Sequence, residues 1–410
     1  MNANINLQMN ETDKNETDNK LEYNGNENID TTTETFEKWD DLNIDRQLLR
    51  SIYSYGYEFP SNIQKKAIIP LMQGKDILAQ AQSGTGKTAA FTIGTLSRID
   101  VNNKTTQALI LAPTHELAHQ ITNVVKGLSS LMDKLCIKTI VGGTSINNDA
   151  QDMKNNPPHI IVGCPGRVCD MIHRKYINAL KIKILVIDEA DEMLSSGFKD
   201  QFLNILQEMD LKAQIALFSA TLPNNILYIT EKIMNDPIKI CVKSESLTLE
   251  GIKQYFVPCI TDTDKFSALK DLYSSISVSQ CIIYCNSVSR VMKLYDALIY
   301  DNYPVCCIHS NMTKNERNSI LNEFKKGNFR ILISSNVTAR GIDIQQVSVV
   351  INFDICNDIH TYLHRIGRSG RWGRKGTGIT FINQRDVRKM KEIEQYYHTE
   401  IVQLPSSFIT

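Results

Sequence analysis

The sequence predicts two α/β domains, each a doubly wound parallel sheet, joined by a short linker. Apolar runs of strand length alternate with helix-length segments from Trp39 onward. Continuous apolar strands are typical of parallel sheets that helices cover on both faces. The alternation pauses over residues 242–252 and then starts again. With 410 residues, 42% of them hydrophobic, the chain is large enough to bury two cores.

We expect four segments in chain order. Residues 1–37 contain nine asparagines and nine acidic residues against only Lys14 and Lys20, which predicts a disordered acidic tail. The first α/β domain is predicted over residues 38–241 and the linker over residues 242–252. The second domain is predicted over residues 253–410.

The elements of the first domain are read from hydrophobic periodicity. Helices are predicted over Leu42–Tyr55 and Thr88–Ile99, with a strand over Asp76–Gln80 before the second of them. Further apolar runs predict strands, in order Ala108–Leu111, Ile160–Val162, Ile184–Ile187 and Ile215–Phe218.

The second domain repeats this rhythm. Its predicted strands are Cys281–Tyr284, Val305–Ile308, Ile331–Ser334, Val347–Ile351 and Gly378–Phe381. Unlike the first domain, it contains no glycine-rich turn ending in Lys-Thr, so we expect it to support a site in the first domain without being the main binding site.

Charge and cysteine content exclude some classes of protein. The formal net charge is zero, but the tail carries −7, so the remainder carries +7, which agrees with a nucleic-acid partner and also with many other enzymes. The ten cysteines include no Cys-x-x-Cys pair, which argues against a zinc ribbon and predicts buried free thiols. No apolar run reaches membrane-spanning length and the tail lacks a signal-peptide core, so the sequence predicts a soluble intracellular protein.

A glycine-rich turn, Ala81–Thr88, follows the first predicted strand. Such a turn directs backbone N–H groups and a helix N-terminus at phosphates, and Lys87 would reach the β and γ phosphates of a nucleotide. The hydroxyl of Thr88 would bind Mg²⁺. The turn begins with alanine where the usual pattern has glycine, so an ordinary strand–helix turn is the alternative. The expected phosphate-binding positions are Ser83, Gly84, Thr85, Gly86, Lys87 and Thr88.

Two acids, Asp188 and Glu189, follow the strand predicted over Ile184–Ile187. Ligands of α/β sheets bind at the carboxyl ends of the strands. We therefore predict that Asp188 holds Mg²⁺, partly through water, and that Glu189 polarises the attacking water. Together with the lysine turn, this predicts hydrolysis of a nucleoside triphosphate.

The segment Tyr362–Arg371 places three arginines three residues apart. If the segment is helical at its start, these arginines lie along one face, and a solvated basic face is the alternative. Phosphoryl transfer needs arginine to neutralise the charge of the transition state, and the first domain offers no clear candidate. Arg368 and Arg371 are therefore predicted as arginine fingers.

These motifs, in this order, resemble those of DEAD-box RNA helicases, named for residues such as Asp188-Glu189-Ala190-Asp191. The chain is similar to the eukaryotic initiation factor 4A group, including its nuclear relatives, from about Trp39 to the C-terminus. The resemblance implies two RecA-like domains with ATP and Mg²⁺ between them. It also implies single-stranded RNA bound across both domains through its backbone, without base reading.

The resemblance assigns further residues to ATP. Gly56–Gln64 is similar to the family's Q motif, in which the glutamine reads adenine, so Gln64 would select ATP with Tyr57 or Phe59 packed near the base. Trp39 stands where the family keeps an aromatic residue. The other implied roles are coupling of hydrolysis to domain closure by Ser219-Ala220-Thr221, ribose contact by Asp343, and contact between His364 and the acidic motif.

On the RNA side, the resemblance implies contacts from both domains: Pro113, Thr114, Glu116, Gly142, Gly143, Pro165, Gly166, Arg167, Asn286, Arg317 and Arg340. The departures from the family pattern fall mostly here: His115 for arginine, Cys164 for threonine, Ser335-Asn336 for Thr-Asp, Ser310-Asn311 for Gly-Asp, and Lys314 for glutamine. We therefore predict intact ATPase machinery with weaker RNA affinity or coupling, to which Lys314 could restore one charge.

Several readings of the function stay open at this point. The first is an ATP-dependent RNA helicase, in translation initiation or in nuclear RNA processing, which opens a few base pairs locally. The second is an ATP-gated RNA clamp held by protein partners, and the third is an ATPase that acts on DNA or on protein. We expect a monomer with protein regulators, in the cytoplasm or the nucleus.

Overall fold

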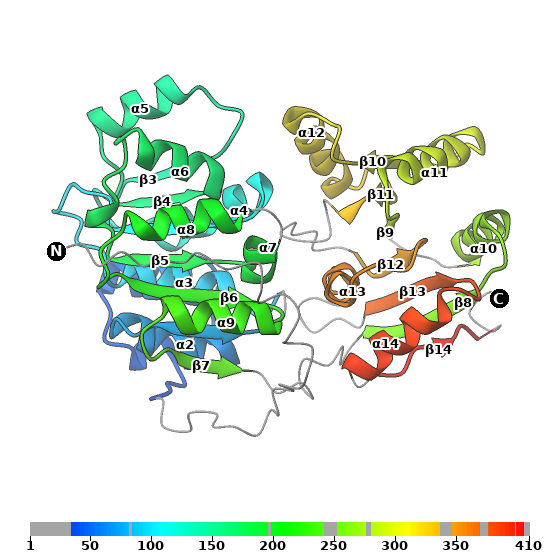
Figure 1. The fold of residues 1–410 in the computed structure, drawn as a ribbon, viewed down its shortest axis with the longest axis horizontal. Helices are drawn as coiled ribbons and strands as arrows, with labels where there is room; N and C mark the ends of the chain where they lie inside the picture. The colour runs from blue at the N-terminus through cyan, green and yellow to red at the C-terminus, as the bar shows by residue number, and fades with distance from the viewer. Residues whose placement is uncertain are drawn as a thin grey trace, which may run out of the picture.

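The computed structural model describes residues 34–81, 84–195, 198–241, 252–275, 280–336, 347–369, 376–397 and 399–405. Two α/β units lie side by side in it, one built from the blue-to-green part of the chain and one from the part that runs from light green to red (Figure 1). The predicted linker lies outside the described residues except for Ile252, which begins a strand. Among the described helices, none is long and apolar enough to span a bilayer.

The first unit contains a parallel sheet of seven described strands in the order β3-β4-β2-β5-β6-β1-β7. Its strands are β1 (Ile77–Gln80), β2 (Ala108–Leu111), β3 (Ile137–Ile140), β4 (Ile160–Gly163), β5 (Ile184–Ile187), β6 (Gln214–Ser219) and β7 (Ile238–Cys241). Its helices are η2 (Trp39–Asp41), α1 (Arg46–Ser54), α2 (Asn62–Met72), α3 (Lys87–Leu96), α4 (His115–Leu128), α5 (Ile146–Asn155), α6 (Pro165–His173), η3 (Ala179–Lys181), α7 (Ala190–Ser195), α8 (Lys199–Gln207) and α9 (Asn224–Ile233).

The second unit contains a parallel sheet of seven described strands in the order β10-β11-β9-β12-β13-β8-β14. Its strands are β8 (Ile252–Pro258), β9 (Cys281–Tyr284), β10 (Val305–Ile308), β11 (Ile331–Ser334), β12 (Val349–Asn352), β13 (Gly376–Ile382) and β14 (Val402–Gln403). Its helices are α10 (Asp262–Ser275), α11 (Val288–Tyr300), α12 (Lys314–Lys325), α13 (Ile359–Ile366) and α14 (Val387–Tyr397).

Alternate residues of each strand enter different cores, as the two-residue period of a strand requires. In the first sheet, Ile110 and Val186 pack with α1 to α4, whereas Leu109 and Leu185 pack with α5 to α9. In Figure 1, α2 and α3 lie behind this sheet and α8 and α9 in front of it. The second sheet is covered by α12 to α14 on one face and by α10 and α11 on the other. The predicted doubly wound fold is confirmed.

The start of the first predicted helix is wrong. Leu42 is the C-cap of η2, and α1 begins only at Arg46, because Asp45 caps it by accepting a hydrogen bond from the backbone N–H of Gln47 at 2.7 Å. The first predicted strand also starts one residue too early, because Asp76 lies just before β1. Its buried carboxylate accepts from the N–H groups of Ile215 and Asn235, which ties the loop before β7 to the sheet.

Candidate active site and nucleic-acid interface

The predicted nucleotide segments converge at one edge of the first sheet. Strands β5, β6 and β1 are neighbours and parallel, so the chain leaves all three at the same carboxyl edge. The glycine-rich turn follows β1, Asp188 and Glu189 follow β5, and Ser219 ends β6. The predicted RNA segments Pro113-Thr114, Gly142-Gly143 and Pro165–Arg167 follow β2, β3 and β4, which occupy the other half of this edge. We call the two halves of this edge the nucleotide half and the RNA half, after the ligands predicted for their segments.

Gly86 is shaped by its contact with Gln64. Gly86 has φ 98°, in the left-handed region, and caps α3 directly before Lys87. A Cβ on Gly86 would lie 2.5 Å from Nε2 of Gln64, which donates a hydrogen bond to the Gly86 carbonyl at 3.3 Å. Oε1 of Gln64 accepts from the N–H of Ser61 at 2.7 Å. The amide predicted to read adenine is thus held against the phosphate turn.

The aromatic residues near Gln64 differ in exposure. Trp39 is fully buried between Phe36 and Tyr57, at centroid distances of 5.7 and 6.4 Å. Phe59 is 72% exposed. The structure therefore places Trp39 in the core under the Q motif, with Tyr57 packed against it.

Lys87 and Glu189 face each other at the centre of the edge. Lys87 Nζ lies 4.0 Å from Glu189 Oε2, and both side chains are buried. Neither atom has a hydrogen-bond partner within the described part of the chain. Glu189 has φ 49°, an uncommon backbone conformation for a residue other than glycine. Buried polar atoms normally find partners, so this pair fits a site that binds polar groups such as phosphate and water.

The two acids after β5 have opposite pKa shifts. Burial, and next the charge of Glu189, raises the pKa of Asp188 to about 7. Burial acts in the same direction on Glu189, but Lys87 and His364 outweigh it and hold its pKa below the ordinary value. The carboxyl of Asp188 and the hydroxyl of Thr88 are the oxygen donors that Mg²⁺ prefers, and a divalent cation would favour the charged form of Asp188. The donor set therefore fits Mg²⁺.

Asp191 connects the two units. Oδ2 of Asp191 lies 2.9 Å from Nε2 of His364 in α13 and accepts a hydrogen bond from the hydroxyl of Thr221 at 2.7 Å. The N–H of Asp191 donates to Oγ of Ser219 at 3.2 Å. One buried cluster of hydrogen bonds therefore joins the acidic segment to the Ser219–Thr221 segment and to α13.

Arg365 and Arg368 do not share one helical face, so that expectation is wrong for these two arginines. Helix α13 ends at Ile366 and Gly367 follows as its C-cap, so Arg368 leaves the helical phase. Arg368 is buried next to this site, and its Nε donates to the carbonyl of His364 at 3.3 Å. Its charge also helps to lower the pKa of Glu189. Four predicted site residues lie outside the described residues: Ser83, Arg340, Asp343 and Arg371.

In the first unit, local contacts hold the predicted RNA segments in place. Thr114 caps α4 by accepting from the N–H of Leu117 at 3.2 Å, and Pro165 is the first residue of α6. Gly142 lies against the imidazole of His115, since a Cβ there would be 3.3 Å from Nε2.

The guanidinium of Arg167 holds the loop after β3. It donates to the carbonyl and the hydroxyl of Thr144, at 2.9 and 3.0 Å, and to Asp149 at 3.0 Å. Arg167 therefore fixes the loop that carries Gly142 and Gly143, and Gly143 is exposed in that loop.

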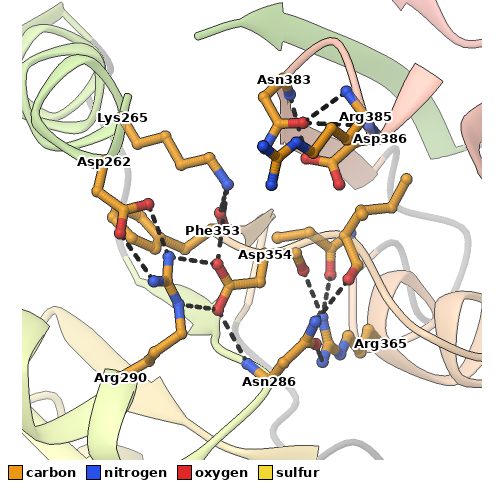
Figure 2. A network of polar contacts seen from close by, with 12 residues as sticks. Asp262, Lys265, Asn286, Arg290, Phe353, Asp354, Arg365, Asn383, Arg385 and Asp386 are labelled. Atoms are coloured by element: carbon orange, nitrogen blue, oxygen red, sulfur yellow. Dashed lines mark hydrogen bonds and ion pairs between the residues drawn. The ribbon is translucent and has the colours of Figure 1, made fainter. Parts of the chain in front are cut away.

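In the second unit, Asn286 and Arg317 have different surroundings. The side chain of Asn286 donates to the carbonyl of Ile355 at 2.8 Å and accepts from Arg365 at 2.8 Å. Arg317 of α12 lies 3.4 Å from Glu116 of α4, which makes a second contact between the units. Asn286 is thus part of a hydrogen-bond network within the second unit, shown in Figure 2. Arg317 instead links the second unit to the RNA half of the first unit's edge through Glu116.

The model of the DEAD/DEAH box helicases matches residues 61–229, and that of the helicase conserved C-terminal domain matches residues 264–373. The chain belongs to the DEAD-box helicase family. It is 50% identical over 369 residues to "ATP-dependent RNA helicase eIF4A" of Lodderomyces elongisporus, which covers 90% of this chain and 92% of the relative. It is 46% identical to "Eukaryotic initiation factor 4A" of Caenorhabditis elegans over 380 residues, 93% of each chain. The structure of S. cerevisiae Dbp5 bound to RNA and ADP BeF3 aligns with a TM-score of 0.84 at 34% identity, over 90% of this chain and 95% of Dbp5.

The departures from the DEAD-box pattern have different structural consequences. Cys164 is the N-cap of α6, and its side chain makes no capping hydrogen bond. This agrees with the replacement of the family's threonine, whose hydroxyl is a good capping group, by a thiol. At Asn336 the amide oxygen still accepts from Nε and Nη2 of Arg365, at 2.9 and 2.6 Å. Asn336 therefore makes two hydrogen bonds with Arg365 without carrying a charge. The side chain of Lys314 lies outside the described residues.

Sequence reasoning missed Arg365 and Asp354. Arg365 is fully buried and also donates to Oδ1 of Asn352 at 3.2 Å and to the carbonyl of Asp354 at 2.9 Å. A usable signal existed for Asp354, because it follows the apolar strand β12 at the same spacing as Glu189 follows β5.

Proposed function

We propose that this chain is an ATP-dependent RNA helicase of the initiation factor 4A type. The observation that carries the proposal is the buried contact between Asp191 and His364. It joins the Lys87–Glu189 pair of the first unit to the helix of the second unit that leads to Arg368. The RNA segments lie on the other half of the same edge, so ATP and RNA can bind side by side.

Each residue then has a chemical role in hydrolysis. Glu189 stays ionised and can accept a hydrogen bond from the attacking water. Lys87 and Arg368 neutralise the charge that develops on the transferred phosphoryl group. Thr88 and Asp188 would hold Mg²⁺, which supplies electrostatic stabilisation of the phosphates. Gln64 and the turn around Gly86 orient the nucleotide, and Arg371 and Asp343 are proposed to complete the site.

RNA coupling follows from the contacts between the two units. RNA bound along Thr114, Gly143 and Arg317 would contact both units, and bringing them together also brings His364 to Asp191. A bent single strand bound in this way favours local opening of a duplex. Gly166, Asn286 and Arg340 are proposed as further backbone contacts.

Protein regulators are proposed because a protein with a similar structure has been solved in complex with one. A solved structure of S. cerevisiae Dbp5, aligned here with a TM-score of 0.76 at 34% identity, is of the complex with Gle1 and IP6. We expect this chain to act as a monomer that such regulators bind, in translation initiation or in nuclear RNA processing. Imaging the tagged protein in its cell would separate the cytoplasm from the nucleus.

The test is ATP hydrolysis with and without single-stranded RNA, together with separation of a short RNA duplex. We expect RNA to stimulate hydrolysis in the wild type. Lys87→Ala and Glu189→Gln should abolish both activities, because they remove the phosphate cation and the water-polarising carboxylate. Identical rates in the wild type and both variants, with or without RNA, would overturn the proposal. Persistent RNA binding in ATP with hydrolysis suppressed by a partner would favour the clamp instead.

A further inference from the structure

The two sheets have the same strand order, so each position in the first unit has a counterpart in the second. The order β3-β4-β2-β5-β6-β1-β7 corresponds strand by strand to β10-β11-β9-β12-β13-β8-β14. Helix α10 follows β8 as α3 follows β1, and Asp354 is the second residue after β12 as Glu189 is after β5. The edge that binds nucleotide in the first unit therefore has a counterpart near Asp354.

This counterpart contains the same kind of ion pair. Nζ of Lys265, in the first turns of α10, lies 3.7 Å from Oδ1 of Asp354, as Lys87 lies 4.0 Å from Glu189. Both Lys265 and Asp354 are buried. The surroundings differ, because in the second unit protein groups fill the place around the pair (Figure 2).

Arg290 is the main group that fills this place. Its Nε donates to Oδ2 of Asp354 and its Nη2 pairs with Oδ1, both at 2.6 Å. Its Nη1 and Nη2 also donate to the carboxylate of Asp262, at 2.8 and 2.9 Å. Lys265 donates to the carbonyl of Phe353 at 2.9 Å. Two cations, Arg290 and Lys265, thus hold Asp354, the counterpart of Glu189.

Asp354 in turn contacts the helix that leads to the proposed catalytic residues. Its Oδ2 accepts from the N–H of Asn286 at 3.0 Å, and its carbonyl accepts from Arg365 at 2.9 Å. Arg365 directly follows His364 in α13 and lies three residues before Arg368. A chain of hydrogen bonds therefore runs from the surface residue Asp262, through Arg290 and Asp354, to the base of α13.

We infer that Asp354, held by Arg290 and Lys265, is a positioning residue that sets the orientation of α13 and so of His364 and Arg368. In the second unit, the residues at the positions that correspond to the nucleotide site hold α13 in place. They thereby position Arg368, which completes the site of the first unit. This inference rests on the proposed function, because it assigns the support to ATP hydrolysis. A role in stability alone is the competing explanation.

The test compares variants in RNA-stimulated hydrolysis with the wild type as reference. Asp354→Asn should lower kcat on the order of ten- to a hundredfold, the scale expected when a catalytic group is displaced by about 1 Å. The KM for ATP should change by about twofold or less, because Gln64 and the glycine-rich turn are untouched. Arg290→Gln should act in the same direction, and it serves as a second variant because its side chain is 33% exposed.

The matched control is Lys270→Met. Lys270 of α10 pairs with Asp301 at the end of α11 at 3.1 Å, so this pair joins the same two helices as Asp262 and Arg290, without contact with α13. Its removal should leave kcat unchanged. The double variant Asp354→Asn with Arg290→Gln should lose no more kcat than Asp354→Asn alone, because both act through one path.

The outcomes separate the two proposals. If the wild type shows no RNA-stimulated hydrolysis, the proposed function fails. If the wild type is active, a kcat of Arg290→Gln and Asp354→Asn equal to that of the wild type or of Lys270→Met overturns the positioning role. The positioning role is also overturned if, across Asp354→Asn, Arg290→Gln and Lys270→Met, the loss of kcat is proportional to the loss of thermal stability. Should Asp354→Asn fail to fold, Arg290→Gln decides alone.

Discussion

Replacing Gly86 by alanine is expected to weaken ATP binding on the order of 30- to 150-fold while leaving the fold intact. The left-handed backbone of Gly86, at φ 98°, costs a residue with a Cβ about 1–2 kcal/mol. The new methyl group would lie 2.5 Å from Nε2 of Gln64. The amide must therefore move and lose its hydrogen bond to the Gly86 carbonyl, which is worth about 1 kcal/mol. Together these effects amount to about 2–3 kcal/mol.

The assay is competition of ATP and of GTP against a fluorescent ADP analogue. Because Gln64 is displaced, the preference for ATP over GTP should fall together with affinity. The melting temperature should change little, since the turn can relax when no nucleotide constrains it.

Two glycines on the RNA half serve as controls for this substitution. Gly143→Ala imposes the same backbone cost, at φ 80°, but its Cβ meets nothing within 4 Å. Gly166→Ala lacks both penalties. Both variants should bind ATP as the wild type does. The reasoning is refuted if Gly86→Ala binds ATP normally, or if its loss appears entirely as lower thermal stability.

Three further predictions concern the RNA half and the second unit. His115→Arg should tighten RNA binding and steepen its dependence on salt, because a permanent charge is added next to Gly142; equal binding at low salt in both proteins would contradict this. Asn336→Asp should raise the free energy of unfolding by about 1 kcal/mol by making the hydrogen bonds from Arg365 charge-assisted, and a lower midpoint in urea would refute it. A hydrogen bond from Arg290 lowers the pKa of Asp262, so its contribution to stability is present above its unfolded pKa of about 3.9 and is lost as the pH falls through the lower folded value. When the free energy of unfolding is measured in urea at about pH 6 and at about pH 3, its decrease between the two should be smaller in Asp262→Asn than in the wild type. Equal decreases in the two proteins would count against the pairing of Asp262 with Arg290.

The central strands were predictable because burial on both faces leaves a continuous apolar run. Five strands have the predicted bounds: β2, β5, β9, β10 and β11. The edge strand β3 was missed because Lys138 and Thr139 interrupt its apolar residues, which an exposed edge tolerates. β14 has two residues, too few for any periodic signal. Strand prediction from this sequence thus succeeds where every residue of the strand is buried and apolar, as in the edge strand β10, and fails where polar residues or a short length remove that signal.

The nucleotide residues were predictable because phosphate chemistry restricts both residue type and spacing. Arg365 was not, because an arginine that binds internal carbonyls and amides looks the same in the sequence as one that binds phosphate. The same ambiguity affected Arg167, whose guanidinium is used by Thr144 and Asp149. Only the three-dimensional arrangement decides which arginines remain free to meet a ligand.

The contacts between Asp191 and His364 and between Glu116 and Arg317 set the energy scale of a conformational equilibrium. Polar contacts of this kind are worth about 1–3 kcal/mol each, so the two supply about 2–6 kcal/mol. Inverting a population from 1:99 to 99:1 takes about 5.5 kcal/mol. Because the distance between Arg317 and Glu116 is long, at 3.4 Å, we expect the sum to lie below this threshold, so the two contacts hold the units together in partnership with a ligand that prefers the joined state. Loss of the γ-phosphate would then be enough to return the population to separated units, and each hydrolysed ATP would release the RNA.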